Sequence, residues 1–137
     1  MTGPGIIDTS VVIELPNITD PSLLPAVPLI TTITLAELSV GPLVTDDRNE
    51  RVRRQRTLQQ AESDFEPLAF DAAAARALGG VAAGLRASGR KSRARAYDAL
   101  IAACAISRDL PVYTMNPADF AHIENLTVVS VPHPTAR

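Results

Sequence analysis

Short runs of apolar and β-branched residues recur along the chain, separated by longer stretches of helical character. The runs lie at residues 6–7, 28–33, 67–70, 111–114 and 126–131. They lack strict alternation of polar and apolar positions, so they predict strands that are buried on both faces. The intervening predicted helices are 34–40, 46–64, 71–87 and 95–108. Alternating strands and helices predict an α/β sandwich with a parallel sheet of about five strands.

The chain has the length and composition of one globular domain. It contains 137 residues, with no internal repeat and no linker long enough to divide it. Hydrophobic residues make up 46% of the sequence, which excludes a disordered chain, whereas aromatic residues make up only 4%. We therefore predict a single domain over residues 1–137 with an aliphatic core.

Cysteine usage and hydropathy indicate the compartment. Cys104 is the only cysteine, so the fold does not depend on an internal disulfide or an oxidising compartment. It is expected to be a small buried residue on a helix. The longest strictly apolar run follows Asp98, and it is far shorter than the roughly 20 residues that span a bilayer. No basic segment precedes an apolar one at the N-terminus. We predict a cytoplasmic protein that does not enter a membrane.

Three acidic residues stand between apolar neighbours. They are Asp8 in GIIDTSVVI, Glu37 in TLAELSV and Asp98 in AYDALIAA. Each has a structural alternative: Asp8 can cap a helix that begins at Thr9, and Glu37 can face solvent on an amphipathic helix. Asp98 can favour the dipole in the first turn of a helix that begins near Arg95. The run after Asp98 is apolar on every side, however, which indicates a buried helix that carries this carboxylate inward.

The three acids are expected to meet at one edge of the sheet. Asp8 ends the first strand, Glu37 lies one turn after the second, and Asp98 starts a helix that leads to the fourth. The carboxyl ends of parallel strands share the edge where such folds bind ligands. Carboxylates within about 5 Å repel by roughly 3 kcal/mol per pair at an effective dielectric constant of about 20. Protonation or a bound cation must relieve this repulsion, and an all-oxygen donor set favours Mg²⁺ or Mn²⁺ over zinc.

A fourth element reaches the same edge. The strand 112–114 runs into the turn TMNPADF, where Thr114, Asn116 and Asp119 follow the strand's carboxyl end. Any of the three can bind a metal, its water or a phosphate. The structural alternative is a helix start, with Asn116 as the N-cap and Asp119 completing a capping box.

Four blocks of the sequence, in this order, resemble the PIN-domain nucleases and, more closely, the VapC toxins of bacterial VapBC toxin–antitoxin pairs. The blocks are IIDTSVVI, TLAEL, RARAYDALIAACA and LPVYTMNPADFAHIENLTVV. The resemblance covers nearly the whole chain. It implies a PIN-like three-layer sandwich, a parallel sheet flanked by helices, and the activity of a metal-dependent ribonuclease.

The resemblance also implies roles for the acids. Asp8 and Asp98 match metal ligands, and Glu37 matches an acidic helix residue that binds a second ion or orients the attacking water. The fourth acidic place falls in the turn, where either Asn116 or Asp119 can fill it. We prefer Asp119, because an asparagine would be a neutral and weaker ligand.

Two hydroxyl residues, Ser10 and Thr114, match positions that family members place near the acids. The reaction implied is hydrolysis of RNA phosphodiester bonds with Mg²⁺ or Mn²⁺, by an endoribonuclease toxin of a type II pair. The implied substrates are tRNA or rRNA. The implied partners are a small VapB-like antitoxin, whose tail crosses the groove and brings an arginine near the acids, and a second copy of the chain.

Basic residues gather in two clusters, Arg48–Arg56 and Arg86–Arg95. Solvated helix faces are the structural alternative for both. The second cluster adjoins Asp98, and a cationic rim beside an acidic pocket would hold the RNA backbone. The residues expected to contact RNA are Arg90, Lys91, Arg93 and Arg95.

Two other functions remain open from the sequence. One is a PIN nuclease of RNA processing without a toxin role. The other is a non-catalytic module of the same fold that binds RNA or a protein partner. The short chain without an added RNA-binding domain favours the toxin over the first, and the three acids together argue against the second.

Overall fold

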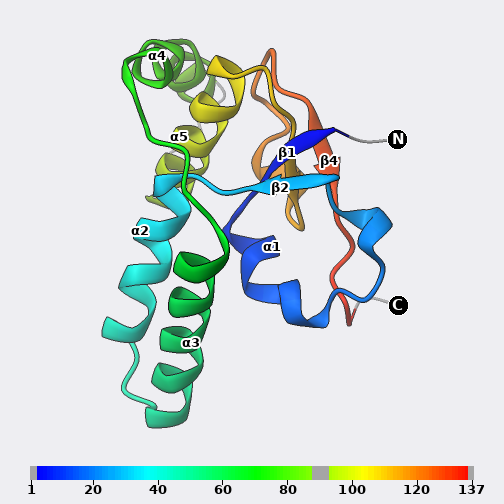
Figure 1. Cartoon of the computed structure of the whole chain (residues 1–137). Coiled ribbons are helices and arrows are strands. Elements are labelled where there is room, and N and C mark those ends of the chain that lie inside the picture. The colour runs from blue at the N-terminus through cyan, green and yellow to red at the C-terminus, as the bar shows by residue number, and fades with distance from the viewer. Residues whose placement is uncertain (1–2, 88–92, 136–137) are drawn as a thin grey trace.

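The chain folds into three layers, with a parallel sheet between two groups of helices (Figure 1). The structure, a computed structural model, describes residues 3–87 and 93–135. Within these residues the strands lie in the order β2-β1-β3-β4, and every neighbouring pair is parallel. Their bounds are Pro4–Ile7 (β1), Val27–Leu29 (β2), Val112–Thr114 (β3) and Val128–Ser130 (β4). The predicted α/β class with a parallel sheet is confirmed.

The helices occupy the predicted stretches with small shifts at their ends. They are α1 (Thr9–Glu14), α2 (Thr32–Val40), α3 (Arg48–Asp64), α4 (Ala72–Ala87) and α5 (Arg93–Ser107). Short 3₁₀ helices are η1 (Leu15–Asn17), η2 (Pro21–Leu23), η3 (Gly41–Leu43) and η4 (Pro117–Asp119). The sequence pattern suggested α1 only as an alternative role for Asp8. Asp71 precedes α4 and accepts a hydrogen bond from Ala74 N at 3.0 Å, so it caps the start of this helix.

The predicted third strand at residues 67–70 is wrong as a full strand, and the described sheet has four strands rather than about five. Only Leu68 joins the ladder, through an isolated parallel bridge to Thr31. The preceding Pro67 has no N–H to donate, and Asp71 already belongs to the start of α4, so the segment is too short to pair further. The run 28–33 also divides, because Thr31 accepts a hydrogen bond from Thr34 N at 3.3 Å and starts α2.

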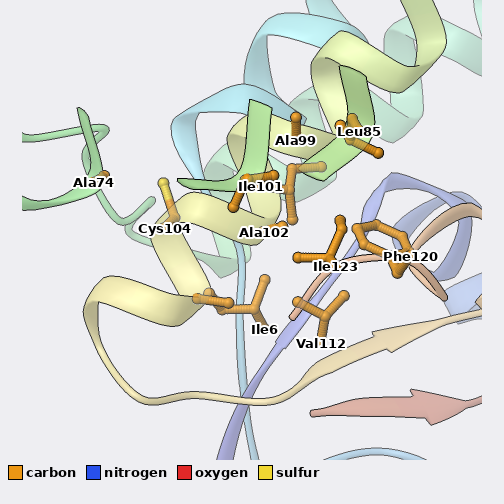
Figure 2. Close-up of a cluster of buried hydrophobic side chains, with 12 residues drawn as sticks. Ile6, Ala74, Leu85, Ala99, Ile101, Ala102, Cys104, Val112, Phe120 and Ile123 are labelled. Atoms are coloured by element: carbon orange, nitrogen blue, oxygen red, sulfur yellow. The ribbon is translucent and has the colours of Figure 1, made fainter. Parts of the chain in front are cut away.

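Both faces of the sheet are buried, as the unalternating strand pattern predicted. Ile6 and Val112 join an apolar cluster with α4 and α5, whereas Ile7 and Tyr113 join a second cluster with α1, α2 and α3. Figure 2 shows the first cluster, where Cys104 lies among aliphatic side chains and is fully buried. The expectation of a buried helical cysteine is confirmed.

Two aromatic side chains, Tyr113 and Phe120, pack closely around the central strands and the turn that follows β3. A Cβ atom at Gly5 would lie 2.7 Å from Cε1 of Tyr113, so the ring of Tyr113 lies directly against β1. Phe120, 1% exposed, anchors the segment after η4 in the first cluster (Figure 2). Among the described residues no helix has both the length and the apolar character required to cross a bilayer.

Candidate active site

The predicted acids lie on segments that follow β1, β2 and β3, and on α5, the helix that precedes β3. Asp8 directly follows β1 and is the N-cap of α1. Glu37 lies on α2, which follows β2, and Asp98 lies on α5. Asp119 is the last residue of η4, just after β3. The topology therefore brings four separated segments to the carboxyl-terminal edge of the sheet.

The Asp8 carboxylate is buried and held by several donors. It is 5% exposed, and its Oδ1 accepts hydrogen bonds from Ser10 Oγ at 2.6 Å and from Val11 N at 3.2 Å. The Thr114 hydroxyl donates to the same carboxylate. Burial raises the pKa of Asp8 above its usual value, and these hydrogen bonds limit the rise. The capping role proposed as an alternative is present.

The two predicted hydroxyl residues connect α1 to the turn after β3. Ser10 Oγ donates to Asp8 and accepts from Met115 N at 3.2 Å. Thr114 is fully buried, and its Oγ1 accepts from Asn116 N at 3.0 Å. Both hydroxyl groups therefore lie beside Asp8, and each also fixes the backbone of the turn.

Glu37 is partly buried rather than free in solvent. Its Oε1 accepts a hydrogen bond from Thr9 Oγ1 at 2.7 Å. Burial raises the pKa of Glu37, the bond from Thr9 opposes that rise, and the charge of Asp8 adds to it. Glu37 and Asp8 therefore share one electrostatic environment.

Asp98 carries the largest perturbation. Burial and then the charges of Asp119, Asp8 and Glu37 raise its pKa from 3.8 to about 7, while Arg95 lowers it. The alternative role in the first helical turn is wrong, because α5 begins at Arg93 and Asp98 is in the second turn. The helix dipole stabilises carboxylates mainly within the first turn. The acids are thus close enough to oppose one another's ionisation.

The turn after β3 does not form the capping box considered from the sequence. Asn116 occupies the N-cap position of the three-residue η4, but its side chain makes no capping hydrogen bond. The Asp119 carboxylate instead forms an ion pair with Arg95 of α5. Asn116 is exposed, and the charge of Asp119 is one of those that raise the pKa of Asp98.

The predicted RNA-contacting residues fall in different places. Arg95 is paired with Asp119, which was not expected from the sequence. Arg93 is the first residue of α5. Arg90 and Lys91 lie outside the described residues. In the first basic cluster, Arg53 and Arg54 both bind Glu50, the former through Nε at 3.1 Å and the latter through Nε at 3.2 Å.

The donor set fits a hard divalent cation. The site offers carboxylate and hydroxyl oxygens, and the pKa of Asp98 is raised by burial and then by negative charge that a cation would neutralise. Within residues 3–87 and 93–135, no three His, Cys, Asp or Glu residues are gathered closely enough to hold an ion together. Mg²⁺ in proteins commonly takes one or two carboxylates and keeps several waters, so a pair such as Asp8 and Asp98 is sufficient.

A groove leads away from Glu37 between α1, α2 and α3. One part, of about 590 Å³, is lined by Thr9, Glu37, Leu38 and residues of α3. A second part, of about 260 Å³, continues between α1 and α3, and both parts share Ile13 and Thr57. Ile13 is 49% exposed. The groove was not predicted from the sequence. The apolar Ile13, directly after the buried pair Val11-Val12, was a signal for an exposed apolar surface on α1.

Comparison with known proteins gives the family. The PIN domain model matches residues 6–126. Ribonuclease VapC5 of Mycobacterium tuberculosis (strain ATCC 25618 / H37Rv) is 40% identical over 129 residues, which are 93% of each chain. A crystal structure of VapBC-5, a toxin–antitoxin system of M. tuberculosis, matches with a TM-score of 0.79 and 36% identity, over 94% of this chain and 99% of that one.

A more distant structure has the same fold. It is DNA-bound VapBC from Salmonella typhimurium, with a TM-score of 0.72 and 27% identity over 93% of this chain and 97% of that one. The family match spans β1 through the turn after β3, and so includes every acid of the candidate site. The chain therefore belongs to the PIN-domain family, and within it to the VapC proteins.

Proposed function

We propose that this chain is the toxin of a type II toxin–antitoxin pair, an endoribonuclease that hydrolyses RNA phosphodiester bonds with Mg²⁺ or Mn²⁺. The observation that carries the proposal is the common electrostatic environment of Asp8, Glu37, Asp98 and Asp119 at the ends of the strands. The ribonuclease name of the relative that is 40% identical supports the reaction class.

The residues of the site have different roles in this proposal. Asp8 and Asp98 would hold the ion, which supplies an acidified water and neutralises charge on the phosphate in the transition state. Ser10 and Thr114 orient the Asp8 carboxylate through their hydroxyl groups. Glu37, held by Thr9, orients the attacking water or contributes to a second ion site.

Asp119 is the proposed fourth acid. Its pairing with Arg95 keeps one positive charge beside the cluster, and this charge lowers the pKa of Asp98. The proposed substrate is tRNA or rRNA, in line with the resemblance to VapC toxins.

A small VapB-like antitoxin is the proposed protein partner. The related structures are described as VapBC toxin–antitoxin systems. The groove that begins at Glu37 is the proposed binding surface, because its lining combines the exposed apolar side chain of Ile13 with Glu37, one of the four acids. A partner segment in this groove would block RNA or metal at the site.

We also propose a homodimer. Helix α4 is rich in alanine and glycine, whose small side chains offer a flat surface for close packing. In the structure Gly79 and Gly80 are exposed, and a Cβ atom added at either would meet no atom within 4 Å. This face of α4 is therefore not used inside the described part of the chain, and a second copy can approach it closely.

Divalent metal is expected to stabilise the purified, antitoxin-free protein and to be required for cleavage. An ion that binds only the native state raises the free energy of unfolding by about 2.7 kcal/mol at a hundredfold excess over its dissociation constant. The measurements are calorimetry with Mg²⁺ and Mn²⁺, thermal melting, and cleavage of mixed tRNA and rRNA with and without a chelator.

Asp8→Asn is the matched variant for this test. Asparagine is as good an N-cap as aspartate, so α1 should remain, whereas the charge at the metal site is removed. We expect the variant to melt normally without metal and to gain no stability from Mg²⁺. Parent protein that shows neither metal binding nor cleavage would contradict the proposed function.

The basic residues Arg90, Lys91 and Arg93, which lead into α5, are expected to contribute RNA affinity without changing metal affinity. Replacing Arg90, Lys91 and Arg93 together by alanine should weaken binding of single-stranded RNA. The slope of log affinity against log salt should fall by about 0.7 for each phosphate that the variant no longer neutralises. Arg95→Ala, in contrast, should also change Mn²⁺ affinity, because Arg95 pairs with Asp119. An unchanged salt slope in the triple variant would remove these residues from the RNA-binding surface.

A further inference from the structure

We propose that Thr9 is a positioning residue for Glu37, and that Thr34 orients the Thr9 hydroxyl. The inference rests on the proposed function, since Glu37 matters only if the acids form the reactive site. The family resemblance gave Ser10 and Thr114 as hydroxyl residues near the acids, and it did not include Thr9 or Thr34.

Two helices are connected at one point by these hydroxyl groups. Thr9 is the first residue of α1, and its Oγ1 lies 2.7 Å from Glu37 Oε1 and 3.0 Å from Thr34 Oγ1. Thr34 and Glu37 are three residues apart on α2, so both side chains fall on the same helix face. A single hydroxyl group therefore bonds two side chains of the neighbouring helix.

The directions of these hydrogen bonds follow from the number of protons. An ionised carboxylate can only accept, so the one hydroxyl proton of Thr9 is donated to Glu37. Thr9 Oγ1 must then accept from the hydroxyl of Thr34. The chain of donors runs from Thr34 through Thr9 to the Glu37 carboxylate.

Thr34, the buried end of this series of hydrogen bonds, is held in place. Thr34 is fully buried, and its backbone N–H already bonds Thr31 Oγ1 at 3.3 Å. A buried hydroxyl without a partner is strongly unfavourable, so Thr34 keeps its bond to Thr9. Branching at Cβ also restricts the rotation of both threonine side chains. The hydroxyl that meets Glu37 is thus held from the interior of the protein.

The consequence is a fixed separation between two acids. Thr9 directly follows Asp8, and both belong to the start of α1. By bonding Glu37, Thr9 ties the carboxylate on α2 to the element that carries Asp8. A glutamate without this bond has three freely rotating side-chain torsions, and its carboxylate would spend much of its time away from the site.

The experiment compares Thr9→Val, which keeps shape but removes the hydroxyl, with Thr9→Ser, which keeps the hydroxyl. Thr34→Val tests the second link. Ser39→Ala is the matched control, because Ser39 is exposed on the same α2 and its hydroxyl bonds Leu35 O at 2.8 Å. Each purified variant is measured for Mn²⁺ affinity by electron paramagnetic resonance, for kcat and KM of RNA cleavage, and by crystallography for the position of the Glu37 carboxylate.

We expect Thr9→Val to displace the Glu37 carboxylate and to lower Mn²⁺ affinity or kcat by about 10–100-fold, as is typical for partners that orient metal ligands. KM should change little. Thr9→Ser should restore the parent values, Thr34→Val should give a smaller change in the same direction, and Ser39→Ala should give none.

Failure of this inference is distinguishable from failure of the proposed function. A parent protein without Mn²⁺ binding and without cleavage contradicts the proposed function, and the crystal structures alone then decide the role of Thr9. A Glu37 carboxylate that keeps its place in Thr9→Val overturns the inference. Parent Mn²⁺ affinity and parent kcat in that variant overturn it equally.

Discussion

Asp98→Asn is expected to reduce RNA cleavage by more than about 100-fold. Residues that merely orient ligands contribute about 10–100-fold, so loss of a ligand's charge should have a larger effect. Asparagine has nearly the same size and retains hydrogen-bonding capacity, but it lacks the negative charge that a hard cation requires. Mg²⁺ should therefore no longer raise the melting temperature of this variant.

The same substitution is expected to stabilise the metal-free protein at pH 8. The folded-state pKa of Asp98 is about 7 and its usual value is 3.8, so the parent loses stability as pH rises from about 4 through 7. Asparagine does not ionise, so the variant keeps the stability that the parent loses as pH rises. After a discount for partial exposure to solvent, the gain in free energy of unfolding is roughly 1–3 kcal/mol.

The measurements are RNA cleavage and thermal melting between pH 5 and 8, with and without Mg²⁺. Asp46→Asn is the control, because it makes the same chemical change at an exposed residue before α3. If Asp98→Asn cuts RNA at the parent's rate, Asp98 is not a catalytic metal ligand.

Ile13→Arg is expected to weaken antitoxin binding by more than about 100-fold while leaving cleavage by the free toxin intact. Ile13 lies where the two parts of the groove meet, and its side chain is half exposed. Truncation of a hot-spot residue at the centre of an interface costs about 2–4 kcal/mol or more, and burying a guanidinium in the interface adds a desolvation penalty. The readout is affinity for the product of the adjacent reading frame, with the mass of the complex measured by light scattering.

Val27→Arg is the matched control. Val27 is 52% exposed, close to the 49% of Ile13, but it lies on β2 and outside the groove. It should bind the antitoxin as the parent does. Equal loss of affinity in both variants would contradict the assignment of the groove, and a mass equal to one copy of each chain would contradict the proposed homodimer.

The sequence predicted the parts of the fold that local patterns determine. Ile6-Ile7 and Val112-Tyr113 place alternate residues on opposite faces of the sheet, so an unbroken apolar run was a sound signal for a central strand. The run at 67–70 gave the same signal, yet it forms one bridge. The run at 67–70 differs because Pro67 cannot donate a backbone hydrogen bond and because α4 begins directly after it. How many residues remain for a strand depends on where the neighbouring helices end and begin.

The candidate site shows a similar division. Parallel strands share one edge, so topology alone was enough to place Asp8, Glu37, Asp98 and the turn after β3 at the same edge of the sheet. The partners of each side chain could not be derived in this way. The pairing of Arg95 with Asp119 joins α5 to η4 over 24 residues, and it depends on the angle between those elements. Thr34 was accessible in principle, because it stands three residues before Glu37 and thus on the same helix face.

The bond between Ser10 and Met115 limits how early during synthesis the acidic site can form. It joins residues 105 positions apart. The pairing of β1 with β3 likewise cannot form until β3 has been synthesised. At about 5–20 residues per second, roughly 5–20 s of synthesis separate the two ends of this contact. Contacts between such distant parts of a chain also form slowly. The proposed nuclease site should thus form only after the last third of the chain has emerged from the ribosome, and the proposed antitoxin, if it is already present, has that time to bind.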